Sequence, residues 1–80
     1  MAGSVVAAAP AHADAALCRT YLVSVGYPGE TSNELRWACQ TGENSPTHSL
    51  CTTPMEAAGV SPFHANIACH LAHEPAASGT

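Results

Sequence analysis

The sequence predicts an all-α fold: two disulfide-stapled αα-hairpins in tandem, a pseudo-repeat that forms a small four-helix unit. The first observation is that segments 17–26 and 50–59 both read Leu-Cys-x-Thr-x-[Leu/Met]-x-x-x-Gly. The second is that each segment is followed by an Ala-Cys pair, at 38–39 and at 68–69. The third is the glycine that ends each segment, because glycine readily adopts the left-handed conformation that terminates a helix.

The first hairpin is expected to begin with a helix over about residues 15–25, with Asp14 as its N-cap. Its apolar side chains fall within one arc of that helix: Leu17, Cys18, Tyr21, Leu22 and Val25. The second helix is expected over about residues 32–40. Thr31 and Glu34 have the spacing of a capping box at its start, and Gly42 is expected to stop it.

The second hairpin follows a polar segment, 42–49, which has the composition of an exposed connection and contains His48. Pro54 lacks a backbone donor, so a helix through it must kink or break. We therefore expect a short turn at 50–52 and a short helix over 54–58. The last helix should cover about 62–73, after Ser61 as the N-terminal hydroxyl residue.

The four cysteines fall at the ends of these hairpins, and four cysteines allow three pairings. Cys18 and Cys51 lie near the start of a first helix, whereas Cys39 and Cys69 lie near the end of a second helix. These positions are neighbours in an antiparallel hairpin, so we predict the disulfides Cys18–Cys39 and Cys51–Cys69. Loops of this length gain about 3 kcal/mol each in a chain-entropy estimate.

The chain of 80 residues is divided into a leader, 1–13, a helical domain, 14–73, and a disordered tail, 74–80. The leader has an apolar run and an Ala-His-Ala segment of the kind that precedes signal-peptide cleavage. The alternative is an ordinary alanine-rich tail. A domain this small needs staples, and disulfides form in oxidising compartments, so we expect a secreted protein.

The charge of the chain limits the classes of partner that it can bind. The formal net charge is −4, and Arg19 and Arg36 are the only basic residues apart from histidine. Binding to a phosphate backbone requires many cations, so nucleic acid is excluded as a partner. No apolar run approaches the ~18 residues of a membrane span. The many alanines and the absence of lysine suggest, as a hypothesis, a bacterial genome rich in GC.

Trp37 is expected to be buried between the hairpins, against a second apolar stripe on the last helix: Phe63, Ile67 and Leu71. The alternative makes Trp37 part of an exposed recognition patch. The turn after Gly26 is three residues longer than its counterpart in the second copy. Because binding residues are often found in loops on a rigid scaffold, we predict binding contacts from Tyr27, Pro28 and Glu30, together with Trp37.

His70 and His73 have the i, i+3 spacing that can present two imidazoles to one metal ion, although a solvated histidine face is the plainer interpretation. His64 falls inside the apolar arc and is expected to be a hydrogen-bonded core histidine. A Cys2His2 zinc site is disfavoured, because neither cysteine pair has the close spacing of a zinc knuckle.

The function that these features favour is a secreted, non-enzymatic binding module or effector that engages another protein, as a monomer or weak dimer. The chain contains no G-x-S-x-G or H-E-x-x-H motif and no glycine-rich phosphate loop, so we expect no enzyme and no cofactor. One alternative is an extracellular metal binder through His70 and His73. The other is a small-ligand or lipid carrier with a gap lined by apolar side chains: Tyr21, Leu22, Trp37, Phe63, Ile67 and Leu71.

Overall fold

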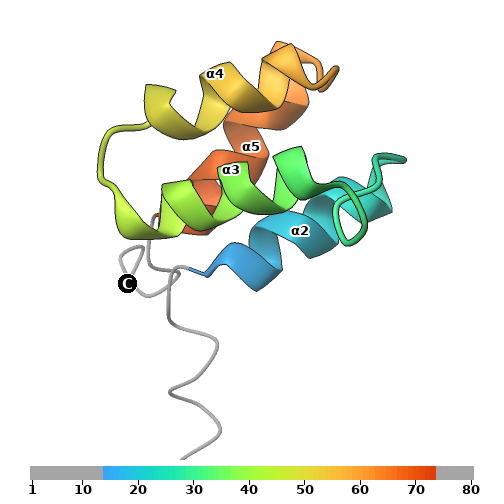
Figure 1. Cartoon of the computed structure of the whole chain (residues 1–80), viewed down its shortest axis with the longest axis horizontal. Helices are drawn as coiled ribbons and strands as arrows, with labels where there is room; N and C mark the ends of the chain where they lie inside the picture. Colours follow the sequence, from blue (N-terminus) through green and yellow to red (C-terminus); the bar gives the residue numbers. More distant parts are fainter. Residues whose placement is uncertain (1–13, 74–80) are drawn as a thin grey trace, which may run out of the picture.

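The computed structural model describes residues 14–73, in which all regular structure is α-helical (Figure 1). Helix α2 spans Ala15–Ser24, α3 spans Asn33–Asn44, α4 spans Ser49–Ala57 and α5 spans Pro62–His73. The predicted leader and tail lie outside the described residues. None of the described helices is long and apolar enough to cross a membrane.

The helices form two hairpins, α2 with α3 and α4 with α5, that pack against each other. The first helix of each hairpin packs on the second helix of the other, since α2 contacts α5 and α4 contacts α3. Helices α3 and α5 are also in contact. Figure 1 shows α3 and α5 between α4 on one side and α2 on the other. The two copies of the repeat therefore occupy equivalent places around the α3–α5 contact.

Both predicted disulfides are confirmed. Cys18 is bonded to Cys39, and Cys51 is bonded to Cys69, so each bond joins the two helices of one hairpin. All four cysteines are fully buried, together with Leu22 and Met55. The staples therefore lie within the hydrophobic core.

The contact between the hairpins is built from small residues. Ala38 and Gly42 on α3, and Ala65, Ala68 and Ala72 on α5, are all buried. A Cβ atom placed on Gly42 would lie 2.9 Å from the Cβ of Ala72 and 2.9 Å from the Sγ of Cys51. Small side chains therefore let the helices approach closely.

The start and the end of α3 differ from the expectation. Ser32, not Thr31, is the N-cap, and its hydroxyl accepts a hydrogen bond from the backbone N–H of Leu35. The helix also continues through Gly42 to Asn44, because Gly42 is needed for close packing rather than for termination. Gly26 and Gly59 do follow the ends of α2 and α4 with φ of 101° and 106°, in agreement with their expected role.

Helix α4 was expected to break at Pro54, and this expectation is wrong. The helix is continuous from Ser49 to Ala57 with Pro54 inside it. Cys51 and Met55 are one turn apart on its buried face and are both fully buried. We attribute the continuity to this packing, which offsets the single backbone hydrogen bond that a proline removes.

Candidate metal centre

Three histidines from the second hairpin meet at its open end. His48 is the residue directly before α4, and His70 and His73 lie in the last turn of α5. The hairpin is antiparallel, so the start of α4 lies beside the end of α5. The Cys51–Cys69 bond fixes this pairing, because Cys51 is one turn after His48 and Cys69 adjoins His70.

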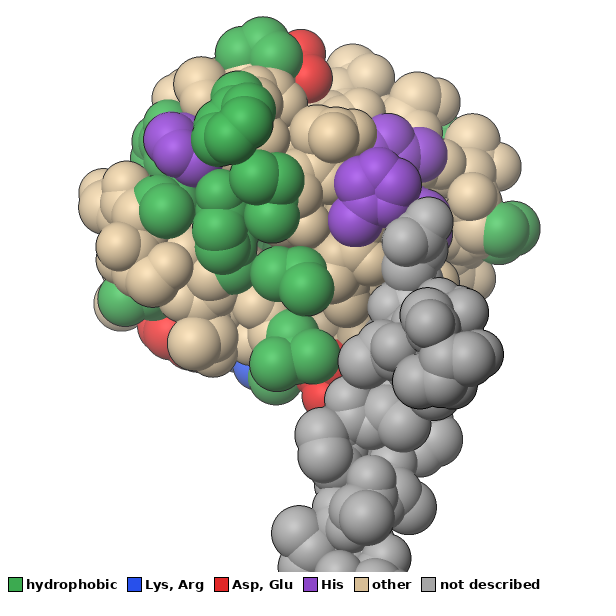
Figure 2. Space-filling view, turned by 180° about the vertical axis from the view of Figure 1, so that it is seen from behind, with side chains coloured by type: hydrophobic (Ala, Val, Ile, Leu, Met, Phe, Trp, Pro, Cys, Tyr) green, Lys and Arg blue, Asp and Glu red, His purple; other side chains and the backbone are tan. Residues whose placement is uncertain are grey.

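One ring nitrogen from each histidine lies within 4.8 Å of a ring nitrogen from both others. Nδ1 of His48 and Nε2 of His73 are 2.7 Å apart. The ring centroids of His48 and His70 are 4.5 Å apart, and those of His70 and His73 are 5.6 Å apart. All three side chains are half-buried, and Figure 2 shows histidines gathered on the surface beside an apolar patch. The cluster is therefore open to a dissolved ion.

This arrangement suits a divalent transition metal. Imidazole nitrogen is a preferred ligand of zinc and copper, and a zinc–nitrogen bond is about 2.0–2.1 Å long. Tetrahedral coordination therefore places nitrogens about 3.4 Å apart, which lies between the 2.7 Å of the His48–His73 contact and the 4.8 Å within which all three ligand atoms lie. Shifts of about an ångström in the imidazole rings would complete the geometry and leave a fourth position open.

The backbone adds a favourable field. His70 and His73 belong to the last turn of α5, where the carbonyl end of a helix carries partial negative charge. The net charge of the chain is also negative, at −4. A cation at the cluster would therefore be stabilised by its surroundings as well as by the imidazoles.

Asn66 supports the cluster from the same helix. Its side-chain Oδ1 lies 2.8 Å from Nε2 of His48, the ring nitrogen that does not face His73. Asn66 precedes His70 by four residues and His73 by seven, so the three residues share one face of α5. This single helix face therefore presents two imidazoles and a hydrogen-bond partner for the third.

The sequence pattern predicted His70 and His73 as possible metal ligands, but it placed His48 only in the connection between the hairpins. The signal for His48 was present in the disulfide pairing. Once Cys51 is paired with Cys69, the residue one turn before Cys51 must lie near the residues that follow Cys69. The same pairing rules out the Cys2His2 alternative, since both cysteines are used in the bond.

His64, expected to be a hydrogen-bonded core histidine, is half-buried and separate from the cluster. Its Nδ1 lies 3.0 Å from the hydroxyl of Ser61 and 3.3 Å from that of Tyr27. The Tyr27 hydroxyl also accepts a hydrogen bond from the backbone N–H of Ser61. Tyr27 therefore ties the long turn of the first hairpin to the start of α5.

The other turn residues predicted to bind a partner are at the surface. Pro28 and Glu30 are exposed, and Glu30 accepts a hydrogen bond from the guanidinium of Arg19 at 3.1 Å. Gly29, between them, is buried against the backbone carbonyl of Arg19. Gly29, in the middle of the turn, thus packs the turn against α2. The binding role of the turn stays a prediction.

The predicted burial of Trp37 between the hairpins is wrong. Trp37 is 64% exposed, and Phe63, in the stripe expected to cover it, is 69% exposed. The physical reason is the small-residue contact between α3 and α5, which leaves no room for an indole ring. The alternative, in which Trp37 lies at the surface, is the correct one.

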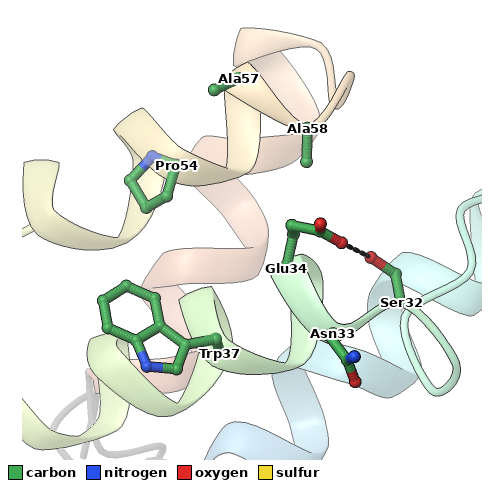
Figure 3. A pocket seen from close by; sticks show the side chains of 7 residues that line it. All are labelled: Ser32, Asn33, Glu34, Trp37, Pro54, Ala57 and Ala58. Atoms are coloured by element: carbon green, nitrogen blue, oxygen red, sulfur yellow. Dashed lines mark hydrogen bonds between the residues drawn. The ribbon is translucent and has the colours of Figure 1, made fainter.

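Trp37 lines an open groove of about 830 Å³ between α3 and α4 (Figure 3). The groove is lined by residues of both hairpins: Ser32, Asn33, Glu34, Trp37, Pro54, Ala57 and Ala58. Of the six residues expected to line a carrier's gap, Trp37 is the one that lines this groove, and Leu22 is fully buried in the core. The predicted binding residues are also separated: Trp37 faces α4, whereas Tyr27 faces α5.

Comparison of the chain with protein-family models, with curated proteins and with solved structures finds no match.

Proposed function

We propose that this chain is a secreted protein that binds one divalent transition-metal ion, zinc or copper, through His48, His70 and His73. The observation that carries the proposal is the convergence of three imidazoles from two helices, with ring nitrogens within 4.8 Å of one another. A pair of neighbouring histidines on one helix is common on protein surfaces. A third imidazole brought in from a distant part of the chain makes a far more specific arrangement.

The compartment supports the proposal. Two core disulfides are expected where the surroundings are oxidising, in agreement with the signal-like composition of residues 1–13. With all four cysteines paired, no thiolate competes for the metal. Neutral imidazole is then the strongest ligand that the described residues offer to zinc or copper.

The Cys51–Cys69 bond supports the proposal further, because it holds the ligands together before the metal arrives. His48 and His70 are separated by 21 intervening residues. The disulfide joins Cys51, one turn after His48, to Cys69, which is next to His70. Less chain entropy is therefore lost when the metal joins these ligands.

The test is a zinc titration of the purified, oxidised protein, followed by calorimetry or by competition with a chromophoric chelator. Wild type should bind one zinc ion per chain. His48→Ala, which installs the residue found at the equivalent place of the first hairpin, should lower the affinity at least ~10-fold, since it removes a ligand. His64→Gln is the matched control and should bind as wild type does.

Two results would contradict the proposal. One is a wild-type protein that binds zinc and copper no better than a variant without the three histidines. The other is an unchanged affinity in His48→Ala, which would reduce the site to a pair of histidines on one helix.

Lowering the pH should weaken binding in wild type, because protons compete with the metal for the imidazole nitrogens.

A second candidate function is the binding of another protein, and the exposure of Trp37 favours it. An aromatic ring that is 64% exposed beside a groove is the type of residue that dominates binding energies at interfaces. The proposed contacts are Trp37 and, on the long turn, Tyr27, Pro28 and Glu30. Cross-linking to proteins of the surrounding medium should lose a specific product with Trp37→Ala and retain it with Asn44→Ala.

A further inference from the structure

The contact between His48 and Asn66 determines which nitrogen of His48 carries hydrogen. Nε2 of His48 lies 2.8 Å from Oδ1 of Asn66. A side-chain amide oxygen only accepts hydrogen bonds, so Nε2 must be the donor. In a neutral imidazole the other nitrogen is then bare. Nδ1 of His48 is therefore a bare acceptor.

The bare nitrogen faces the cluster. Nδ1 of His48 lies 2.7 Å from Nε2 of His73, so Nε2 of His73 must donate this second hydrogen bond. In the metal-free cluster, His73 thus donates a hydrogen bond to His48, and His48 donates one to Asn66. The lone pair of His48 points to the place that a metal ion shared with His73 would take.

From this order we infer that Asn66 is a positioning residue for the metal: it holds His48 in the tautomer with hydrogen on Nε2 and so presents Nδ1 as the ligand atom. This inference rests on the proposed function. Histidines that bind metals almost always donate their second ring N–H to an oxygen, and this oxygen fixes the tautomer and the orientation of the ring. Here that oxygen comes from the same face of α5 as His70 and His73.

The inference also assigns the exchange that accompanies binding. A bound zinc ion would take the place of the hydrogen between the rings of His48 and His73, and Nδ1 of His48 and Nε2 of His73 would be its ligand atoms there. Nε2 of His73 would give up its hydrogen, and the His73 ring would change to the tautomer with hydrogen on its other nitrogen. The charge of the protein ligands is unchanged, and Asn66 keeps its hydrogen bond throughout.

The first part of the experiment uses the metal-free protein. Long-range ¹H–¹⁵N spectra of the imidazoles report which ring nitrogen carries hydrogen. In wild type, His48 should be in the Nε2–H form, whereas Asn66→Ala should give a mixture of both forms. Asn66→Asp, which keeps an acceptor oxygen, should restore the Nε2–H form. A merely structural role for Asn66 would not change this spectral signature.

The second part is a zinc titration of the same variants. Asn66→Ala should bind about 10-fold more weakly than wild type, at the low end of such effects because Asn66 is exposed to water. Asn66→Asp should recover the affinity. Asn33→Ala, the same change in the hairpin that has no cluster, should bind as wild type does.

The outcomes separate the two claims. A wild-type protein that binds no zinc overturns the proposed function and the inference with it. Zinc binding that is intact in wild type and unchanged in Asn66→Ala overturns the inference alone. A metal-free His48 with hydrogen on Nδ1 in wild type also overturns the inference alone.

Discussion

The two hairpins share a scaffold and differ at one end. Each has a buried disulfide between equivalent positions, and each closes with a glycine at positive φ. When the cysteines are aligned, the residues of the cluster in the second hairpin face unrelated residues in the first: His48, Asn66, His70 and His73 match Ala15, Arg36, Gln40 and Glu43. The open end of the hairpin can therefore change its chemistry while the stapled core stays the same.

The opposite ends of the hairpins differ in another way. The long turn of the first hairpin places Tyr27 against Ser61 and His64, whereas the short turn of the second places Val60 in the core. Tyr27, at the position equivalent to Val60, makes this contact between the hairpins, whereas the inserted residues Gly29 and Glu30 contact Arg19 of their own hairpin. Each copy therefore has its own feature at one end. The first has Tyr27 in contact with the other hairpin, and the second has the histidine cluster.

The largest effect is expected from removing a disulfide. Cys18→Ala/Cys39→Ala and Cys51→Ala/Cys69→Ala should each lower the free energy of unfolding by about 3 kcal/mol, since the bonds close loops of similar length, with sequence separations of 21 and 18. Zinc affinity should fall only in the second variant, because only that bond joins the helices that carry the ligands. Chemical denaturation and zinc titration measure the two effects.

The two disulfide variants control for each other. Equal losses of zinc affinity in both would mean that the staples act only through global stability. That result would remove the distinction between the hairpins on which the comparison rests.

A smaller effect is expected at the contact between α3 and α5. Gly42→Ala should destabilise the protein by about 1–3 kcal/mol, because the added methyl overlaps Ala72 and Cys51. Adding Ala72→Gly should recover part of this loss, since it removes one of the two overlaps. Thermal or denaturant unfolding of the single and double variants measures the coupling. Strict additivity of the two changes would contradict close packing between these residues.

The smallest effect on stability is expected from Trp37→Ala, at less than about 1 kcal/mol, because most of the indole is already in water. A buried tryptophan would cost about 3–5 kcal/mol. Ile67→Ala is the matched change at the equivalent position of the second hairpin. Ile67 is half-buried, so its loss should cost more than that of Trp37. The reverse order would place Trp37 in the core after all.

The sequence alone was enough to predict the hairpins and the disulfides, because both follow from a local motif that occurs twice in the chain. Gly26, Gly59 and the four cysteines mark the ends of the helices within a few residues. The path through Pro54 and Gly42 was not predictable in this way. In both places, packing against another helix overrides the local preference of the residue.

The candidate site was predicted in part, and the reason is the same. His70 and His73 are neighbours on one helix, so their spacing in the sequence reveals them. His48 and Asn66 join them only when the hairpin closes, and Trp37 lies at the surface only because the facing helices meet through alanine and glycine. Such contacts depend on the distance between helices, which single-sequence patterns do not give.

Three histidines of the second hairpin are proposed to form one metal site. A crystal structure of the oxidised protein with zinc, with data collected at the zinc absorption edge, would show which side chains hold the ion. If the three histidines hold the ion together, one anomalous peak lies about 2.0–2.1 Å from ring nitrogens of His48, His70 and His73. A peak bound to His64 or to surface carboxylates, with His48 still hydrogen-bonded to His73, would contradict the proposed site.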